Sequence, residues 1–587
     1  MKLFTGILVA AAMAMSACAI QYQPKITEKE ISSTISVLAS EKFQGRKPGL
    51  PGDSLAAHFV LGKFKKAGLK MLFDDGFQPV KLITGFTFGT TNHLSSGSRS
   101  FELGADYEPL FFSANKSFSG QLAVAGYGIT VSSDSLKWDD YNGLQADGRW
   151  ILILDGIPGH LQQNKEIKRY SDVRSKVLNA IDHHAGGILV VTPDFNTKGA
   201  ARTVVFDKNS APYSVPVLKI SQKTADLMMN GQLTFNDIEN NIKSAQKPLF
   251  TSTNLNVQGE ASVLPKITMA HNIVGLLPGT DPKLAEEYVI VGAHYDHLGY
   301  GGPGSGSRMP DTVAVHHGAD DNASGVAAVV ELAQKFSHAK SNRRPILFLA
   351  FTAEESGLIG SKAFVTNPPF SLKKATAMFN FDMVGRLDSA KDLTIGGVGT
   401  ALETKAMIDS LVHGFSVKIS KEGYGPSDHA SFYGENIPVI YFTSGVHDQY
   451  HTPNDTWDRI NFKGEKMIVE NAALMIQEVA NRSQRLTYQE SGPKVGNSTR
   501  TDLKVTLGII PDYVGSEKEG MRIDGVSPGK PAYKAGLLKG DIILAIDGKK
   551  VGSIYDYMAR MKAYVPGQII SVDVLRGKEK KVFLVTL

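Results

Sequence analysis

The sequence predicts an α/β fold: a mixed, largely parallel sheet with helices on both faces, joined to smaller β-rich domains. Three observations predict it. Four near-continuous apolar runs, at 287–297, 344–355, 375–385 and 437–445, are typical of strands buried on both faces. A helical, amphipathic pattern at 322–336 falls between the first two runs. Polar residues gather where each run ends, the edge at which open α/β sheets form their sites.

The N-terminus has the features of an export signal. Lys2 is followed by an apolar stretch that ends in small residues, which predicts a secretory signal peptide over 1–19. Met15–Cys18 (MSAC) resembles a lipobox, whose Cys18 would be lipidated, while Ala17–Ala19 also fits ordinary cleavage. We favour the lipoprotein interpretation, in which an exported, periplasmic or cell-surface protein meets the membrane only through that lipid.

Composition excludes several kinds of site and partner. The net charge of +5 over 587 residues has no basic stripe, so we expect no nucleic-acid partner. Cys18 is the only cysteine, so the mature chain has neither a disulfide nor a thiolate ligand. Any metal site must therefore be built from His, Asp and Glu.

The remaining segments suggest further domains, as expected for a chain too long for one core. Residues 31–70 have a helical sequence pattern, with an amphipathic stretch at 54–69. Residues 118–250 have the pattern of short strands and turns, and we interpret them as an insert. Residues 483–501 are polar and turn-rich, like a linker, and 502–587 are β-rich. The main domain would thus be discontinuous, over 25–117 and 251–482.

Metal-ligating side chains cluster at the ends of the apolar runs. Nine of the 15 histidines lie between residues 294 and 451. Buried carboxylates at this density are costly unless cations neutralise them. Asp321, Glu355 and Asp382 supply three negative charges, which two divalent ions and a bridging hydroxide would balance. With nitrogen and oxygen ligands only, two Zn²⁺ are the best match, and Co²⁺ or Mn²⁺ would also fit.

Five motifs in this region carry a resemblance: AHYDHLG (293–299), GADDNASG (318–325), TAEESGLIGS (352–361), NFDMVG (380–385) and YHTPNDT (450–456). Together they resemble the signatures of the co-catalytic dizinc aminopeptidases, the family of aminopeptidase Y, bacterial leucyl aminopeptidases and glutamate carboxypeptidase II. The resemblance covers roughly 25–110 and 250–485. It implies a zinc exopeptidase fold and removal of N-terminal residues from peptides or proteins.

The resemblance also implies a ligand set. His294 and Asp382 would bind one zinc, Glu355 and His451 the other, and Asp321 would bridge them. Asp296 would hold the second nitrogen of His294. The peptide bond between Asp321 and Asn322 is expected to be cis.

Two residues would act on the substrate. Neighbouring residues at a strand end point in different directions, so Glu355 can bind zinc while Glu354 acts as the general base on a metal-activated water. Tyr450 matches a family position that helps to stabilise the tetrahedral oxyanion.

The flanking segments have their own resemblances. YSVPVLKIS (213–221) in the insert resembles protease-associated domains. The tail resembles the PDZ domains of exported bacterial proteases, in which the amides of Leu507, Gly508 and Ile509 would receive the C-terminal carboxylate of a peptide. A stabilising or dimerising role for the tail is the alternative.

Three other functions compete with the aminopeptidase. A metallocarboxypeptidase would use the same five ligands. A glutaminyl-cyclase-like enzyme would work with one zinc, whereas this chain carries the full two-metal set. A non-catalytic peptide-binding relative would have lost ligands, and none is missing here.

Overall fold

The computed structural model describes residues 25–587 apart from 133–135, 169, 194, 196–211, 303, 493–502, 512–518, 527–528 and 553. The predicted signal peptide with Cys18, and residues 493–501 of the predicted linker, lie outside the described residues. The chain forms two compact units: the described residues up to Val80 with Met269–Gly492, and Lys81–Thr268 with Pro493–Leu587. No helix in the described part of the chain is long and apolar enough to cross a membrane.

The first unit is built on a nine-stranded mixed sheet. Its strand order is β1-β13-β15-β14-β16-β19-β17-β18, and β2 pairs with β13 beside this path. The strands are β1 (Lys70–Met71), β2 (Phe77–Phe88), β13 (Val263–Leu277), β14 (Tyr288–His294), β15 (Ile346–Phe351), β16 (Ala375–Phe381), β17 (Asp392–Gly396), β18 (Ser416–Ile419) and β19 (Val439–Thr443). The four predicted apolar runs become β14, β15, β16 and β19, which lie together and run parallel.

These central strands are apolar along their length because both faces are buried. In β15, Ile346 and Phe348 pack into the core on one face, whereas Leu347 and Leu349 pack into the core on the other. Alternate side chains of a strand point to opposite faces, so a strand covered on both sides needs an apolar residue at every position. The predicted fold class is confirmed.

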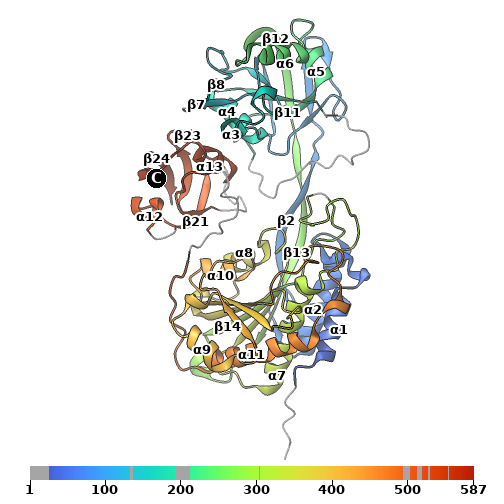
Figure 1. Cartoon of the computed structure of the whole chain (residues 1–587), viewed down its shortest axis with the longest axis vertical. Coiled ribbons are helices and arrows are strands. Elements are labelled where there is room, and N and C mark those ends of the chain that lie inside the picture. The colour runs from blue at the N-terminus through green and yellow to red at the C-terminus, as the bar shows by residue number, and fades with distance from the viewer. Residues whose placement is uncertain are drawn as a thin grey trace, which may run out of the picture. The chain divides into compact units, whose positions relative to one another are not determined.

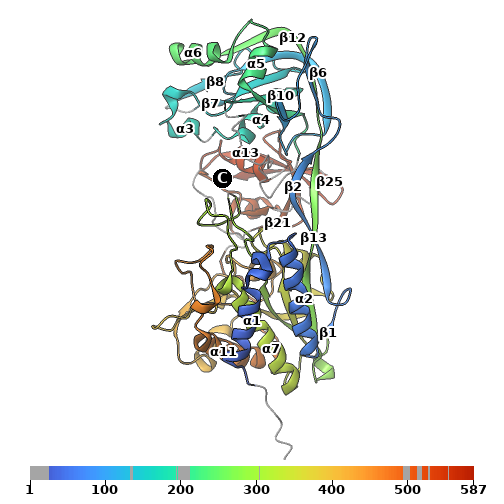
Figure 2. The ribbon, with the colours of Figure 1, turned by 90° about the vertical axis from the view of Figure 1, so that its right-hand side faces the viewer.

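Helices cover both faces of this sheet. Helices α1, α2 and α7 lie together along one side (Figure 2), where α1 and α2 both contact α7. Side chains from α8 and α10 join the core on the opposite face. The helices are α1 (Glu28–Leu38), α2 (Pro51–Lys66), α7 (Gly325–Ala339), α8 (Ile359–Thr366), α9 (Thr404–Leu411), α10 (His429–Gly434) and α11 (Phe462–Asn481).

The insert has a core of its own around an eight-stranded sheet, ordered β4-β3-β12-β6-β9-β10-β11-β5. Its strands are β3 (His93–Ser96), β4 (Arg99–Ser100), β5 (Tyr107–Pro109), β6 (Lys116–Ala125), β9 (Trp150–Leu154), β10 (Gly187–Thr192), β11 (Val217–Ser221) and β12 (Phe250–Ala261), with β7 (Thr130–Ser132) and β8 (Lys137–Asp139) as a separate pair. Its helices are α3 (Lys165–Lys168), α4 (Val173–Asp182), α5 (Gln222–Met228) and α6 (Phe235–Ala245).

The insert is larger than predicted. Strands β3 to β5 belong to its sheet and not to the main domain, so residues 93–109 lie outside the predicted bounds of 118–250. The chain passes from the first unit to the insert within β2 and returns within β13, and these two strands pair with each other. Figure 1 shows β2 and β13 side by side, as does Figure 2. The assignment to protease-associated domains stays a prediction.

The C-terminal domain has its own sheet and core. Its elements are β20 (Ile509–Pro511), β21 (Met521–Val526), α12 (Pro531–Ala535), β22 (Ile542–Ile546), β23 (Lys549–Lys550), α13 (Ile554–Met561), β24 (Ile569–Arg576) and β25 (Glu579–Thr586).

The first part of the predicted linker is not a free connection. Tyr488 forms a β-bridge with Ala401, and the Tyr433 hydroxyl donates a hydrogen bond to the Ser491 carbonyl at 3.0 Å. Residues up to 492 therefore belong to the first unit. The polar composition of this segment hid a few anchoring contacts, including the buried Leu486.

Candidate metal centre

The candidate site lies at the carboxyl ends of the central strands. His294 is the last residue of β14, Glu354 and Glu355 follow β15, and Asp382 follows β16 directly. These strands are parallel neighbours, with His294 in register with Phe351 of β15, so their ends meet at one edge. The sheet topology thus brings together side chains far apart in the sequence.

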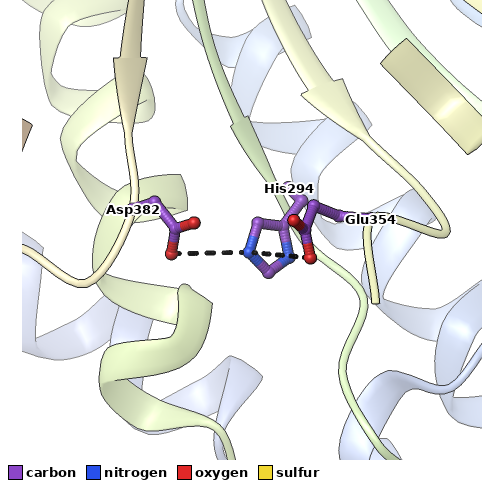
Figure 3. A group of neighbouring side chains, drawn as sticks. All are labelled: His294, Glu354 and Asp382. Carbon is purple, nitrogen blue, oxygen red and sulfur yellow. Dashed lines mark ion pairs between the residues drawn. The ribbon is translucent and has the colours of Figure 1, made fainter. Parts of the chain in front are cut away.

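His294 is the centre of one group of donors. Its Nε2 lies 3.4 Å from Asp321 Oδ1, 3.5 Å from Asp382 Oδ1 and 3.9 Å from Glu354 Oε2. Figure 3 shows Asp382 and Glu354 on either side of the imidazole. His294 is buried, whereas the Glu354 and Asp382 side chains are 12% and 11% exposed. Solvent therefore reaches the two carboxylates but not the imidazole.

A second group of donors lies around His451. Its Nε2 lies 3.1 Å from Asp321 Oδ2 and 3.2 Å from Glu355 Oε2. Asp321 therefore directs one oxygen to each group, as a bridging ligand must. Ligands placed tetrahedrally about 2.0–2.1 Å from a zinc ion are about 3.3 Å apart, close to the spacing of both groups. All five predicted ligands lie together at spacings compatible with zinc, and their binding of two ions stays a prediction.

Asp321 is held through its backbone. It lies in the irregular turn Ala319–Ser324 that leads into α7, and its peptide bond to Asn322 is cis, as the resemblance implied. The N–H groups of Asp320 and Asp321 both donate to Asp455 Oδ2, at 3.0 and 3.1 Å. Asp455 stands in the quoted motif YHTPNDT, but its role was missed because its partners are backbone amides.

Asp296 lies against the second nitrogen of His294, as predicted, and also supports Glu354. His294 Nδ1 lies 3.2 Å from the backbone carbonyl of Asp296 and 3.6 Å from its carboxylate. The carboxylate also accepts a hydrogen bond from the Glu354 N–H, at 3.0 Å. The Asp296 backbone thus orients the imidazole, while its side chain fixes the start of the glutamate pair.

His297 is a site residue that sequence reasoning missed. Its Nδ1 lies 2.8 Å from Glu355 Oε1 and 3.7 Å from Asp321 Oδ2, and the imidazole is buried. An ionised carboxylate can only accept, so Nδ1 carries the proton when it bonds Glu355. The family pattern gives His297 no ligand role, and its place in the motif AHYDHLG was the available signal.

The adjacent glutamates have opposite electrostatic environments. Burial raises the pKa of Glu354 well above its usual value, and the Glu355 charge adds to this effect. Burial acts on Glu355 too, but hydrogen bonds from His297 and His451 hold its pKa well below the usual range. Such a split is typical of a pair with two roles, a proton acceptor beside a permanently charged ligand.

His451 is oriented by the segment that follows β14. Its Nδ1 donates to the Gly306 carbonyl at 3.1 Å, which leaves Nε2 to face Asp321 and Glu355. Burial lowers the pKa of His451, but hydrogen bonds to the Asp321 and Glu355 carboxylates outweigh burial and raise the pKa to about 10 in the metal-free protein. A zinc ion would have to displace that proton.

Tyr450 lies beside the second group. Its ring stacks on His451 with centroids 3.8 Å apart. Burial, followed by the Asp321 and Glu355 charges, raises the pKa of Tyr450, so its hydroxyl stays protonated and can donate a hydrogen bond. The predicted oxyanion role stays a prediction.

The three predicted carboxylate-binding residues lie at the start of the C-terminal sheet. Leu507 is buried, and its carbonyl accepts the Ala532 N–H. The Gly508 N–H donates to the Thr506 hydroxyl at 3.1 Å, and Ile509 begins β20. Their binding role stays a prediction.

Comparison with known proteins identifies two of the domains. Residues 272–476 match the model of peptidase family M28. The chain contains a peptidase family M28 domain. Residues 504–587 match the PDZ domain model. The two matches confirm the resemblance of the main domain to zinc exopeptidases and of the tail to PDZ domains.

The M28 domain has relatives named as aminopeptidases. "Probable leucine aminopeptidase 1" of Trichophyton verrucosum is 30% identical over 226 residues, which are 35% of this chain and 56% of that protein. Aminopeptidase YwaD of Bacillus subtilis is 30% identical over 203 residues, or 33% and 41% of the two chains. This chain therefore spans about half the length of these relatives.

Among solved structures, the aminopeptidase from Aneurinibacillus sp. strain AM-1 is similar over 80% of this chain and 96% of its own. Its sequence identity is 23% and the TM-score is 0.44.

Proposed function

We propose that this chain is a zinc-dependent aminopeptidase that binds two zinc ions. His294 and Asp382 would hold one ion, Glu355 and His451 the other, and Asp321 both. The observation that carries the proposal is Asp321, whose two oxygens lie 3.4 and 3.1 Å from the imidazoles of His294 and His451. Zinc bound there would make a water nucleophilic at neutral pH and polarise the scissile carbonyl.

The protein's own residues would supply the remaining steps. Glu354 takes a proton from the attacking water and delivers it to the leaving amine, a task suited to its raised pKa. Its amide is fixed by Asp296, so the carboxylate starts from a defined position. The Tyr450 hydroxyl donates a hydrogen bond to the oxyanion.

An aminopeptidase is favoured over a carboxypeptidase by the relatives, since both M28 relatives described above carry aminopeptidase names. In the same proposal the chain is exported and anchored through Cys18, which rests on residues 1–19 alone. The PDZ domain would bind peptide C-termini near Leu507, Gly508 and Ile509.

The test is hydrolysis of a panel of aminoacyl anilides by metal-stripped and zinc-restored protein. We expect zinc to restore cleavage of free-amine substrates, while N-acetylated versions stay intact. Glu354→Gln should bind two zinc ions per chain but lose at least a hundredfold in kcat, because it cannot accept the proton.

Zinc-loaded protein that cleaves only peptides with a free C-terminus would replace the aminopeptidase by a carboxypeptidase. Zinc-loaded protein that cleaves neither substrate class would contradict an exopeptidase. A Glu354→Gln variant with full activity would remove Glu354 as the base.

A further inference from the structure

Arg46 is a fully buried arginine close to the metal centre. It ends the short helical segment Glu41–Arg46 after α1, and its side chain is 0% exposed. No carboxylate of the described residues lies within ion-pair distance of it. A buried, unpaired guanidinium is costly, so its position requires an explanation.

The guanidinium bonds only backbone carbonyls. Nε donates to Tyr295 O at 2.7 Å, and Nη2 donates to Gly318 O at 2.8 Å. Nη1 donates to both His317 O and Leu38 O at 2.7 Å. Four of the five N–H groups of the fork are thus used, which satisfies the charge without a counter-ion.

These carbonyls belong to the segments that carry the metal ligands. Tyr295 lies between His294 and Asp296, and Gly318 precedes Asp321 by three residues. One rigid side chain therefore ties the loop after β14 to the turn before α7, and both to α1 through Leu38.

The backbone beside Arg46 strengthens the same connection. The Gly299 N–H donates to Gly45 O at 3.0 Å. Gly45 has a φ of 65°, and a Cβ there would lie 2.4 Å from Gly299 O and 2.6 Å from His316 O. The chain thus passes this point without room for a side chain.

The charge itself acts on the site. Burial lowers the pKa of Arg46 to about 10, so it stays protonated at neutral pH, and Asp321, Asp455 and Asp296 oppose the shift. A fixed positive charge close to these carboxylates reduces their mutual repulsion, as bound zinc ions also would.

We infer that Arg46 is a positioning residue of the metal centre: it holds the His294 loop and the Asp321 turn at the separation that two zinc ions require. This inference rests on the proposed function. Lysine keeps the charge but offers a single ammonium in place of a planar fork, so it cannot span four carbonyls. Glutamine provides neither the positive charge nor the planar fork of donors.

The experiment measures zinc affinity of the full-length chain by competition with a chromophoric chelator, beside anilide hydrolysis and thermal unfolding. Arg46→Lys should raise the zinc dissociation constant at least tenfold, and Arg46→Gln should raise it further.

The matched control is Arg344→Lys. Arg344 is also 0% exposed and donates to backbone carbonyls, but it lies before β15, at the opposite end of that strand from Glu354, and pairs with Glu287. It should lose stability without losing zinc affinity.

Equal zinc affinity in wild type and Arg46→Lys would overturn the inference, as would an equal loss in Arg344→Lys. Arg46→Lys protein that does not fold even with zinc would assign Arg46 to the stability of the fold and overturn it too. Wild-type protein that binds no zinc would instead overturn the proposed function.

Discussion

At the scale of residues, the two adjacent glutamates differ because of their neighbours and not because of their chemistry. Two imidazoles bond Glu355, whereas Glu354 has its closest imidazole nitrogen at 3.9 Å. Glu355 is therefore charged and suited to bind a cation, while Glu354 holds a proton more readily. In the proposed function, two identical side chains would thus take the separate roles of metal ligand and general base.

His297 provides a test of this division. His297→Ala removes the hydrogen bond to Glu355, and we expect zinc affinity to fall about 10- to 100-fold, the usual effect of losing a residue that orients a ligand. His297→Asn keeps a donor and should lose less. Chelator competition measures both values.

The matched control is His317→Ala, since the His317 Nδ1 bonds the Ala39 carbonyl and reaches no metal ligand. If His297→Ala bound zinc as tightly as wild type, Glu355 would not depend on His297.

At the scale of elements, helix α7 contains a buried carboxyl group, Glu331, that lies outside the metal centre. The burial of this group makes the stability of the protein depend on pH. Glu331 is 3% exposed, and burial, followed by the Glu30 charge, raises its pKa to about 7. The folded protein thus binds this proton more tightly than the unfolded chain, whose glutamate titrates near 4.5. The stabilisation is complete below pH 4.5 and is lost as the pH rises to about 7.

Glu331→Gln should remove this dependence. At pH 8 we expect the variant to have a free energy of unfolding about 1–3 kcal/mol higher than wild type, and at pH 4.5 a value close to it. Urea unfolding followed by circular dichroism at both pH values measures the difference. The control Glu286→Gln changes an 81% accessible carboxylate that pairs with Lys374 at the surface, so it should differ from wild type by at most about 1 kcal/mol at both pH values. A constant difference between Glu331→Gln and wild type would show that Glu331 does not titrate in this range.

At the scale of the whole molecule, the candidate ligands are confined to one unit. Both donor groups described above lie within residues 294–451, which belong to the first unit. Zinc should therefore stabilise this unit alone. At a free zinc concentration 100 times the dissociation constant, we expect its unfolding free energy to rise by about 2.7 kcal/mol.

Calorimetry with and without a chelator should then move one unfolding transition and leave the others in place. His451→Ala should reduce that shift, since it deletes a ligand. A shift of every transition would mean that the units unfold together or that zinc binds elsewhere.

The sequence predicted those parts of the molecule whose cause is local. Strands β14, β15, β16 and β19 could be predicted because burial on both faces makes every position apolar. The candidate ligands were predicted from the motifs that carry the family resemblance, and the meeting ends of β14, β15 and β16 explain why His294, Glu355 and Asp382 lie together.

What sequence analysis missed depends on contacts between distant segments. Arg46 and Asp455 bind backbone groups, which leave no pattern in the partner's sequence. Strands β3 to β5 are short and lie in Gly- and Ser-rich sequence, so sequence analysis did not recognise them as strands of the insert. The insert therefore begins earlier than predicted.

The paired strands β2 and β13 have a consequence for how such a chain can arise and change. The insert's two connections lie side by side, and the Thr84 and Thr268 hydroxyls are 3.0 Å apart. The chain leaves the first unit and returns to it at neighbouring points. The intervening 180-odd residues (85–267) could therefore be inserted or deleted in a single genetic event, because a short turn would be enough to join β2 to β13. Ancestry of the catalytic scaffold and of its insert can therefore be separate, and relatives that lack the insert would need no repair of their sheet.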